Sequence, residues 1–313
     1  MVSLMKIVKI TDVAIIGGGP AGLSAALILG RCCRQVILFD HDKPRNYAAR
    51  QLNGYLGLEN CSPRELRARG RQQALSYGAE IVSAEVLSAH TNPTDHGRFT
   101  IITADGPPRH ARKLLLATGT LDVLPEIENL RDLYGKGVYH CPYCDGWEHR
   151  HGHLVALGDG PAPVGLALAL RNWSELITVC TQGQELSPAQ QAFLQERKLG
   201  YRPDKVAQVQ SGPNGFLNLV VFENGPSLAC DALFFASEQR QRSRLPELLG
   251  CDCDPDGLIR SHKKQTTNIP GLYIAGDADG DVQFAIVAAA EGATAAAAIN
   301  RELQDEDYGV LEP

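Results

Sequence analysis

One stretch near the start of the chain limits the fold more than any other. A short apolar run at residues 12–16 leads directly into a turn with the pattern G-x-G-x-x-G, and alanine- and leucine-rich residues 23–30 follow. The run suits a buried parallel strand, and residues 23–30 are expected to form a helix. Such glycines let the backbone approach a pyrophosphate at the helix N-terminus, where free N–H groups and the helix dipole favour anions. The stretch therefore predicts a dinucleotide-binding unit, whose candidate cofactor-binding residues are Gly17, Gly19, Pro20, Ala21 and Gly22.

A second strand is predicted at residues 36–40, and it ends in an acid. Asp40 lies 18 residues after Gly22, close to the roughly 20 expected for the acid that binds ribose hydroxyls. A carboxylate at this point suits a free 2′-hydroxyl and repels a 2′-phosphate. The first nucleotide site is therefore expected to take FAD or NAD in preference to NADP.

Two cysteines in the middle of the chain form the second informative feature. They stand two residues apart in the run His140-Cys141-Pro142-Tyr143-Cys144-Asp145, where they can close a small disulfide ring and where a helix can begin at Pro142. The thiolate is the reactive form of cysteine, and a helix N-terminus or a nearby base lowers the pKa of the thiol. Cys141 and Cys144 are therefore the candidate redox pair, with an acid directly after them and His140 as an alternative base.

A zinc site is the competing interpretation of this segment. Besides the two cysteines it contains His149, His151 and His153, all of residue types that bind zinc. The C-x-x-C part fits a zinc site, whereas the H-x-H-x-H spacing does not match the usual finger. We therefore expect no metal here and treat the segment as a redox centre.

A second strand–turn–helix pattern begins at residues 154–157 and resembles the first in a damaged form. Its turn reads Gly158-Asp159-Gly160-Pro161-Ala162-Pro163-Val164-Gly165, so that Pro163 stands at the third small position and Asp159 puts a carboxylate in the loop that would hold phosphates. The next predicted strand, at residues 176–180, is followed by residues 181–185, which include no arginine to hold a 2′-phosphate. NADPH is therefore expected to bind poorly.

Composition narrows the class of protein. The 313 residues are enough for two domains, and a 44 % hydrophobic, 21 % charged composition is typical of a soluble globular protein. The net charge of −6 argues against nucleic-acid binding, and no apolar run reaches the length of a membrane span. Nine irregularly spaced cysteines and the absence of a signal peptide favour the reducing cytoplasm. Cys251 and Cys253 are expected to be free thiols, because one intervening residue makes a strained ring.

Other segments complete the organisation. A buried strand at residues 113–119 ends at Gly119, and the chain is expected to cross into another domain near Thr120. The alanine-rich residues 282–299 after Gly276-Asp277 are expected to form a helix, and the acidic tail from Gln304 to Pro313 is expected to be mobile. A predicted helix at 63–77 carries four arginines, which indicate either a dock for an acidic electron donor or, more simply, a solvated face. These are Arg64, Arg67, Arg69 and Arg71.

Taken together, the motifs resemble the low-molecular-weight thioredoxin reductase family over essentially the whole chain. The matching stretches are residues 17–22, 117–119, 141–145 and 266–277. The resemblance implies an α/β fold with two Rossmann-like three-layer nucleotide-binding domains. The FAD-binding domain would be discontinuous, comprising residues 1–120 and 245–313, and the central domain at 121–244 would be inserted and would carry the cysteines. Family members are usually homodimers.

The same resemblance implies roles for individual residues. Asp277 would bind the ribityl chain of FAD and Gln283 would lie beside the isoalloxazine ring. Asn53, Gly119 and Gly276 are further candidate cofactor-binding residues. Cys144 would face the flavin, Cys141 would exchange with the substrate sulfur, and Asp145 would act as the acid/base. The helix near Val282 would direct its positive end at the flavin.

The sequence departs from the family in two places. The arginines that read NADPH are missing, and Asp281-Val282 replaces the arginine that normally precedes the flavin-side Gln283. We therefore expect a thioredoxin-reductase-like flavoprotein disulfide oxidoreductase that is not driven by NADPH, but by a ferredoxin-like donor or a second FAD. Its disulfide substrate would be thioredoxin or a small dithiol. An oxygen-dependent dithiol oxidase of the gliotoxin and holomycin type is the alternative, and a flavin- or zinc-bearing binding or sensor protein is the alternative of another class.

Overall fold

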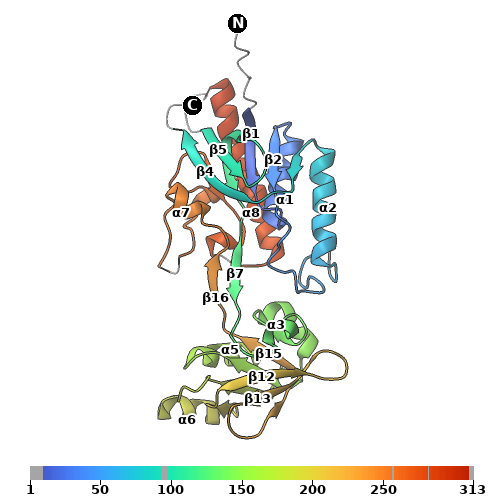
Figure 1. Ribbon diagram of the computed structural model, residues 1–313, viewed down its shortest axis with the longest axis vertical. Coiled ribbons are helices and arrows are strands. Elements are labelled where there is room, and N and C mark those ends of the chain that lie inside the picture. Colours follow the sequence, from blue (N-terminus) through green and yellow to red (C-terminus); the bar gives the residue numbers. More distant parts are fainter. Residues whose placement is uncertain (1–9, 93–97, 256, 281, 310–313) are drawn as a thin grey trace. The chain divides into compact units, whose positions relative to one another are not determined.

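The computed structural model describes residues 10–92, 98–255, 257–280 and 282–309, which fold into two compact units (Figure 1). The first unit takes the chain up to Tyr47, Tyr55–Leu121, and the chain from Arg240 onward. The second unit takes Ala48–Gly54 and Asp122–Gln239. The return crossing thus lies at residues 239–240, five residues before the predicted 245. Residues 48–54, which sequence reasoning left in the first domain, fold with the second unit.

A largely parallel sheet forms the centre of the first unit. Its strands follow the order β3-β2-β1-β6-β5-β4, and β17 pairs with the second half of β6. β1, β2, β3, β6 and β17 run parallel, whereas β4 and β5 are antiparallel additions. The bounds are β1 Ile10–Ile16, β2 Val36–Phe39, β3 Glu80–Val82, β4 Val86–Asn92, β5 Arg98–Thr103, β6 Arg109–Leu116 and β17 Leu272–Ile274.

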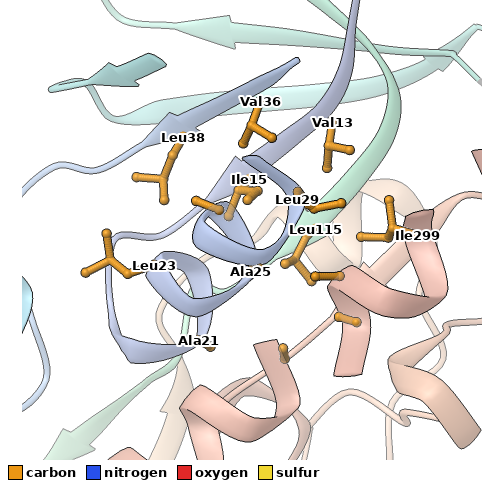
Figure 2. Close-up of a cluster of buried hydrophobic side chains, with 14 of the residues drawn as sticks. Val13, Ile15, Ala21, Leu23, Ala25, Leu29, Val36, Leu38, Leu115 and Ile299 are labelled. Atoms are coloured by element: carbon orange, nitrogen blue, oxygen red, sulfur yellow. The ribbon is translucent and has the colours of Figure 1, made fainter. Parts of the chain in front are cut away.

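Helices α1 and α8 pack against each other and against this sheet. The buried cluster between them includes Ile15, Leu115 and Ile299, whose side chains converge in Figure 2. The two helices approach so closely that a Cβ on Gly292 would lie 2.0 Å from the carbonyl oxygen of Ala21. The helices of this unit are α1 Pro20–Arg31, α2 Pro63–Ser76, α7 Leu245–Leu249 and α8 Ala285–Tyr308, with short 3-10 turns η2 Lys263–Gln265 and η3 Asp277–Asp279.

The expected acidic tail is largely helix, which corrects the prediction from sequence. α8 begins three residues later than expected and continues to Tyr308, because its last turns carry acids that pair with Arg112 and Lys113 in the middle of β6. Glu306 accepts hydrogen bonds from Lys113 at 2.5 Å and from Arg112 at 2.7 Å. Residues 310–313 lie outside the described part of the chain.

The second unit is a smaller α/β unit with a five-stranded parallel sheet. Its order is β11-β10-β9-β15-β8, and a separate antiparallel sheet, β12-β13-β14, belongs to the same unit. The strand bounds are β8 Val138–Tyr139, β9 Leu154–Leu157, β10 Ile177–Cys180, β11 Gly200–Arg202, β12 Val206–Ser211, β13 Leu217–Phe222, β14 Leu228–Ala229 and β15 Ala232–Phe235. The helices are α3 Leu130–Leu133, α4 Pro142–Asp145, η1 Trp147–His149, α5 Ala162–Leu170 and α6 Pro188–Glu196.

The two sheets give the predicted α/β class with two Rossmann-like units. Each central strand of the second unit is buried on both faces, as all four residues of β9, β10 and β15 are, which is the mark of a parallel sheet covered on both sides. The two chain crossings, β7 Thr120–Val123 and β16 Glu238–Gln241, pair as a two-stranded sheet. In the described part of the chain no helix is both long and apolar enough to cross a membrane.

Candidate functional site

Four turns meet at one edge of the sheet in the first unit. They follow the carboxyl ends of β1, β2, β6 and β17, which are neighbouring parallel strands. These turns hold Gly17, Asp40, Gly119 and Asp277, all predicted from sequence as cofactor residues. Ligands of open α/β sheets bind at this carboxyl edge. The fold thus brings together residues that are up to 260 positions apart.

The glycine turn before α1 leaves room where a nucleotide phosphate is expected. Gly17 adopts φ +118°, and a Cβ on Gly22 would lie 1.9 Å from the carbonyl oxygen of Gly17, so both positions require glycine. A Cβ on Gly19, in contrast, would meet no atom within 4 Å. Gly19 is the N-cap of α1, Pro20 follows it, and the first turn carries no acidic side chain. The first N–H groups of a helix have no partner inside the helix, so this end of α1 suits an anion.

Asp40 is buried and is held by arginines of α2. Its carboxylate accepts hydrogen bonds from Arg67 at 3.1 Å and from Arg71 at 2.9 Å. Arg67 also bonds Asp42 and thereby lowers the pKa of that exposed carboxyl group. Both interpretations of the arginine-rich helix were therefore wrong for Arg67 and Arg71, which are internal partners of Asp40. The carboxylate also does not stand alone, so charge by itself gives no reason for this site to reject a 2′-phosphate.

Asp277 and Gln283 lie close together, joined by an arginine that sequence reasoning assigned no role. Arg45 Nη1 donates to Asp277 Oδ2 at 2.8 Å and to Gln283 Oε1 at 2.6 Å. Gly276, at φ +78°, donates its N–H to Glu291 of α8 at 2.6 Å. Gln283 precedes the N-cap of α8, so the helix begins beside it. Asp281, which with Val282 replaces the arginine of the family pattern, lies outside the described residues.

The residues at this edge fit FAD. The open space at Gly19 and the start of α1 suit the pyrophosphate, and the buried Asp40 lies at the next strand end, where a ribose is expected. The hydroxyl oxygen of Thr118, beside Gly119, is buried without a hydrogen-bond partner among the described residues. A buried polar atom of this kind is costly unless something bonds it, which a ligand at the sheet edge would do.

The two central cysteines form a disulfide at the end of β8. The Cα atoms of Cys141 and Cys144 lie 5.4 Å apart. Cys141 is the N-cap of α4, which starts at Pro142 as the sequence predicts. Cys141 Sγ also accepts a hydrogen bond from the backbone N–H of Cys144 at 3.2 Å. Asn53, predicted to contact the cofactor, donates its amide to the carbonyl oxygen of Cys144 at 2.8 Å. This bond ties residues 48–54 to the redox segment, a link that no local sequence signal reveals.

Asp145 is placed to exchange a proton at neutral pH. Burial and, secondly, the negative charge of Glu148 raise its pKa to about 7. Burial, with a contribution from Asp145, likewise raises the pKa of Tyr139 to about 12. The Tyr139 hydroxyl lies 3.1 Å from Nε2 of His149, whose own pKa is lowered by burial. A carboxyl group that titrates near pH 7 beside a disulfide is suited to acid/base work.

His140 and His153 have partners in the fold, and Cys251 and Cys253 are not bonded to each other. His140 lies with Nδ1 2.8 Å from the Tyr134 hydroxyl, which agrees with a structural role. His153 bonds Thr178 at 2.9 Å, and within the described ranges no group of three metal-ligand side chains is assembled. The two cysteines that the zinc interpretation requires are bonded to each other in the disulfide. Cys251 and Cys253 are free thiols, as predicted.

Comparison with known proteins agrees with this fold and site. Residues 11–292 match the family described as pyridine nucleotide-disulphide oxidoreductase. Thioredoxin reductase tcpT of Claviceps purpurea is 32 % identical over 289 residues, 87 % of this chain and 88 % of its own. The crystal structure of a putative thioredoxin reductase TrxB from Bacillus anthracis is 30 % identical with a TM-score of 0.89, covering 95 % of this chain and 100 % of that one. The crystal structure of HlmI is 32 % identical with a TM-score of 0.91, covering 95 % and 94 %.

Fold and site thus define an FAD-dependent disulfide oxidoreductase. The chain belongs to the pyridine nucleotide-disulphide oxidoreductases, among the flavoproteins of the low-molecular-weight thioredoxin reductase type.

Proposed function

We propose that the chain moves electrons between FAD in its first unit and a substrate disulfide through Cys141 and Cys144, and that NADPH is not its electron donor. The observation that carries the second part is the start of α5, where the family's second nucleotide site would lie. That helix offers no backbone donor in its first three residues, unlike α1.

The hydrogen bonds around Pro161 explain why. Pro161 is the N-cap of α5 and Pro163 is its second residue, and neither has an N–H group. The N–H of Ala162 is used by the carbonyl oxygen of Asp159 at 3.3 Å, and that of Val164 by Pro161 at 3.1 Å. A pyrophosphate at a helix N-terminus is held by such N–H groups. The exposed carboxylate of Asp159 adds a like charge in the same turn.

The side chains of the turn after β10 offer a 2′-phosphate no cation either, and the nearby Lys205 pairs with Glu223 at 3.1 Å. Gln182 uses its side-chain oxygen to accept the N–H of Val206 at 2.8 Å, and Glu185 accepts from Tyr201 at 3.0 Å. Arg202, on the neighbouring strand, pairs with Asp204 at 3.0 Å. Phosphate recognition relies on charge-assisted bonds from arginine or lysine, and residues 181–185 include neither.

The chemistry at the disulfide follows from its surroundings. Bound FAD supplies two-electron exchange with the cysteine pair. In the reduced pair, a Cys141 thiolate keeps the backbone N–H of Cys144 as a donor, which favours the charged form. Attack of this thiolate on a substrate disulfide forms a mixed disulfide and releases one substrate thiolate.

The second half of the exchange closes the ring again. Cys144 attacks Cys141, the Cys141–Cys144 disulfide forms, and the second substrate sulfur leaves as a thiolate. Two electrons pass from the cysteine pair to the substrate, and its two thiolates take up two protons, one from Cys144 and one from the water that accepted the Cys141 proton. Asp145, with its pKa of about 7, takes the proton from Cys144 and gives one to the departing sulfur. The same steps run backwards when a dithiol is oxidised.

An anaerobic dithionite titration of the FAD-loaded protein tests the redox pair. Wild type is expected to take up four electrons per chain, two for FAD and two for the disulfide, and Cys144→Ser only two. Six electrons would identify a second flavin. A wild-type uptake of two electrons with an intact disulfide afterwards would contradict exchange between FAD and the pair.

A further inference from the structure

We propose that Arg45 is a positioning residue at the flavin end of the cofactor site. The sequence has no arginine next to Gln283, and the fold brings Arg45 to that place instead. The inference rests on the proposed binding of FAD in the first unit. It concerns a residue 232 positions from Asp277 and 238 from Gln283, which no motif in the sequence singles out.

The contacts place one nitrogen atom between two oxygens. Arg45 Nη1 donates to Asp277 Oδ2 and to Gln283 Oε1, at 2.8 and 2.6 Å. The Arg45 side chain is only 13 % exposed and that of Asp277 21 %. Arg45 comes from the loop after β2, Asp277 starts the turn after β17, and Gln283 leads into α8. The guanidinium therefore fastens together two loops at the carboxyl edge of the sheet.

The arginine also decides which way the Gln283 amide faces. A guanidinium has donors and no acceptor, so Gln283 must turn its oxygen to Arg45. Its NH₂ group then points away from Arg45, within the same amide plane. A flavin ring, which presents carbonyl oxygens and ring nitrogens at its edge, is recognised by donors of this kind. Arg45 thus sets the orientation in which Gln283 meets a cofactor.

Charge gives Arg45 a second effect. Reduction of a bound flavin to its anionic form adds a negative charge, which a nearby cation stabilises. The start of α8 has no acidic residue in its first turn and adds a positive dipole end at the same place. Screening of the Arg45 charge by water is weak, because the side chain is mostly buried. The Asp277 carboxylate offsets part of that charge, and removal of Arg45 would leave this carboxylate without its cation. Arg45 is therefore expected to raise the midpoint potential of the bound flavin.

The test measures FAD affinity and midpoint potential in three variants. Arg45→Gln keeps a hydrogen-bond donor and removes the charge, whereas Arg45→Lys keeps the charge and loses the fixed geometry. Arg34→Gln is the matched control, because Arg34 is 12 % exposed and pairs with Asp307 at the opposite end of the same unit. Thermal unfolding of each FAD-loaded protein reports the purely structural loss.

Arg45→Gln is expected to lower the ratio of reduced to oxidised flavin about tenfold at a fixed ambient potential, which is about 30 mV for a two-electron couple. Its FAD dissociation constant is expected to rise about tenfold. Arg45→Lys should change the ratio of reduced to oxidised flavin by no more than about twofold while still binding FAD more weakly. Arg34→Gln should leave both the midpoint potential and the FAD dissociation constant unchanged.

Two results would overturn the inference: an Arg45→Gln protein with the wild-type potential and affinity, or an Arg34→Gln protein that shifts both equally. If Arg45→Gln does not fold, an Arg45→Lys protein with a lowered potential overturns it as well. Wild-type protein that binds no FAD would instead contradict the proposed function, so the two failures are distinguishable.

Discussion

Replacement of Asp145 by asparagine should make the oxidised protein more stable in alkaline solution. The pKa of Asp145 is raised from 3.8 to about 7, so the folded state binds its proton more tightly than the unfolded state does. Stability contributed by this proton is complete below pH 4 and is lost as the pH rises to about 7. The full difference corresponds to about 4 kcal/mol of unfolding free energy. Asp145 keeps part of its surface in water, and this screening reduces the expected gain of the variant to about 1–3 kcal/mol.

Thermal unfolding of wild type and Asp145→Asn at pH 4.5 and pH 8.5 measures the effect. At pH 8.5 the variant should unfold roughly 3–10 °C above wild type, and the difference should shrink at pH 4.5. Oxidised protein is used so that Cys141 and Cys144 do not titrate. Asp132 is an exposed acid on α3 of the same unit, so Asp132→Asn serves as the control. It should leave the unfolding temperature unchanged at both pH values. An Asp145→Asn protein that is no more stable than wild type at pH 8.5 would refute the assigned environment of Asp145. So would a stability difference from wild type that is larger at pH 4.5 than at pH 8.5.

Three further predictions concern the disulfide, the cofactor and the acid. Cys144→Ser should abolish turnover of a substrate disulfide, whereas Cys253→Ser, which removes an exposed free thiol, should turn over like wild type; equal activity of both would argue against the pair. Gly19→Glu should purify without flavin colour because the added side chain fills the open space before α1, and Gly165→Glu, which also enters open space but on α5, should stay yellow. Glu148→Gln removes a negative charge that raises the pKa of the neighbouring acid, so the acid limb of the pH–rate profile should move to lower pH; an unmoved or raised limb would exclude that coupling.

Local patterns in the sequence were enough for the elements that hold the site. The turn around Gly17 and Gly22 is dictated by sterics within a few residues, and Pro142 at the start of α4 pre-sets a helical φ. The buried strands before these turns are continuous apolar runs, which a parallel sheet requires. Such signals need no knowledge of distant residues, so the α/β class and the disulfide were accessible from the sequence.

Long-range pairing was not accessible in this way. Arg45 finds Asp277 across 232 residues, and Arg71 finds Asp40 across 31, so no spacing rule connects either pair. The same holds for the end of α8, where Glu306 reads as part of a solvated acidic tail until Lys113 of β6 is placed beside it. Side chains that act across elements become visible only when the sheet order is known.

Anaerobic reduction of the FAD-loaded protein by NADPH, compared with reduction by a dithiol, tests the central claim most directly. The flavin absorbance should bleach with a dithiol through Cys141 and Cys144 and should stay essentially unchanged with micromolar NADPH or NADH. Reduced ferredoxin in the same experiment identifies a protein donor, and peroxide formed from a dithiol in air identifies an oxidase. Rapid, saturable bleaching by micromolar NADPH would contradict the account, because it would require a phosphate site at the start of α5 where Pro161 and Pro163 leave none.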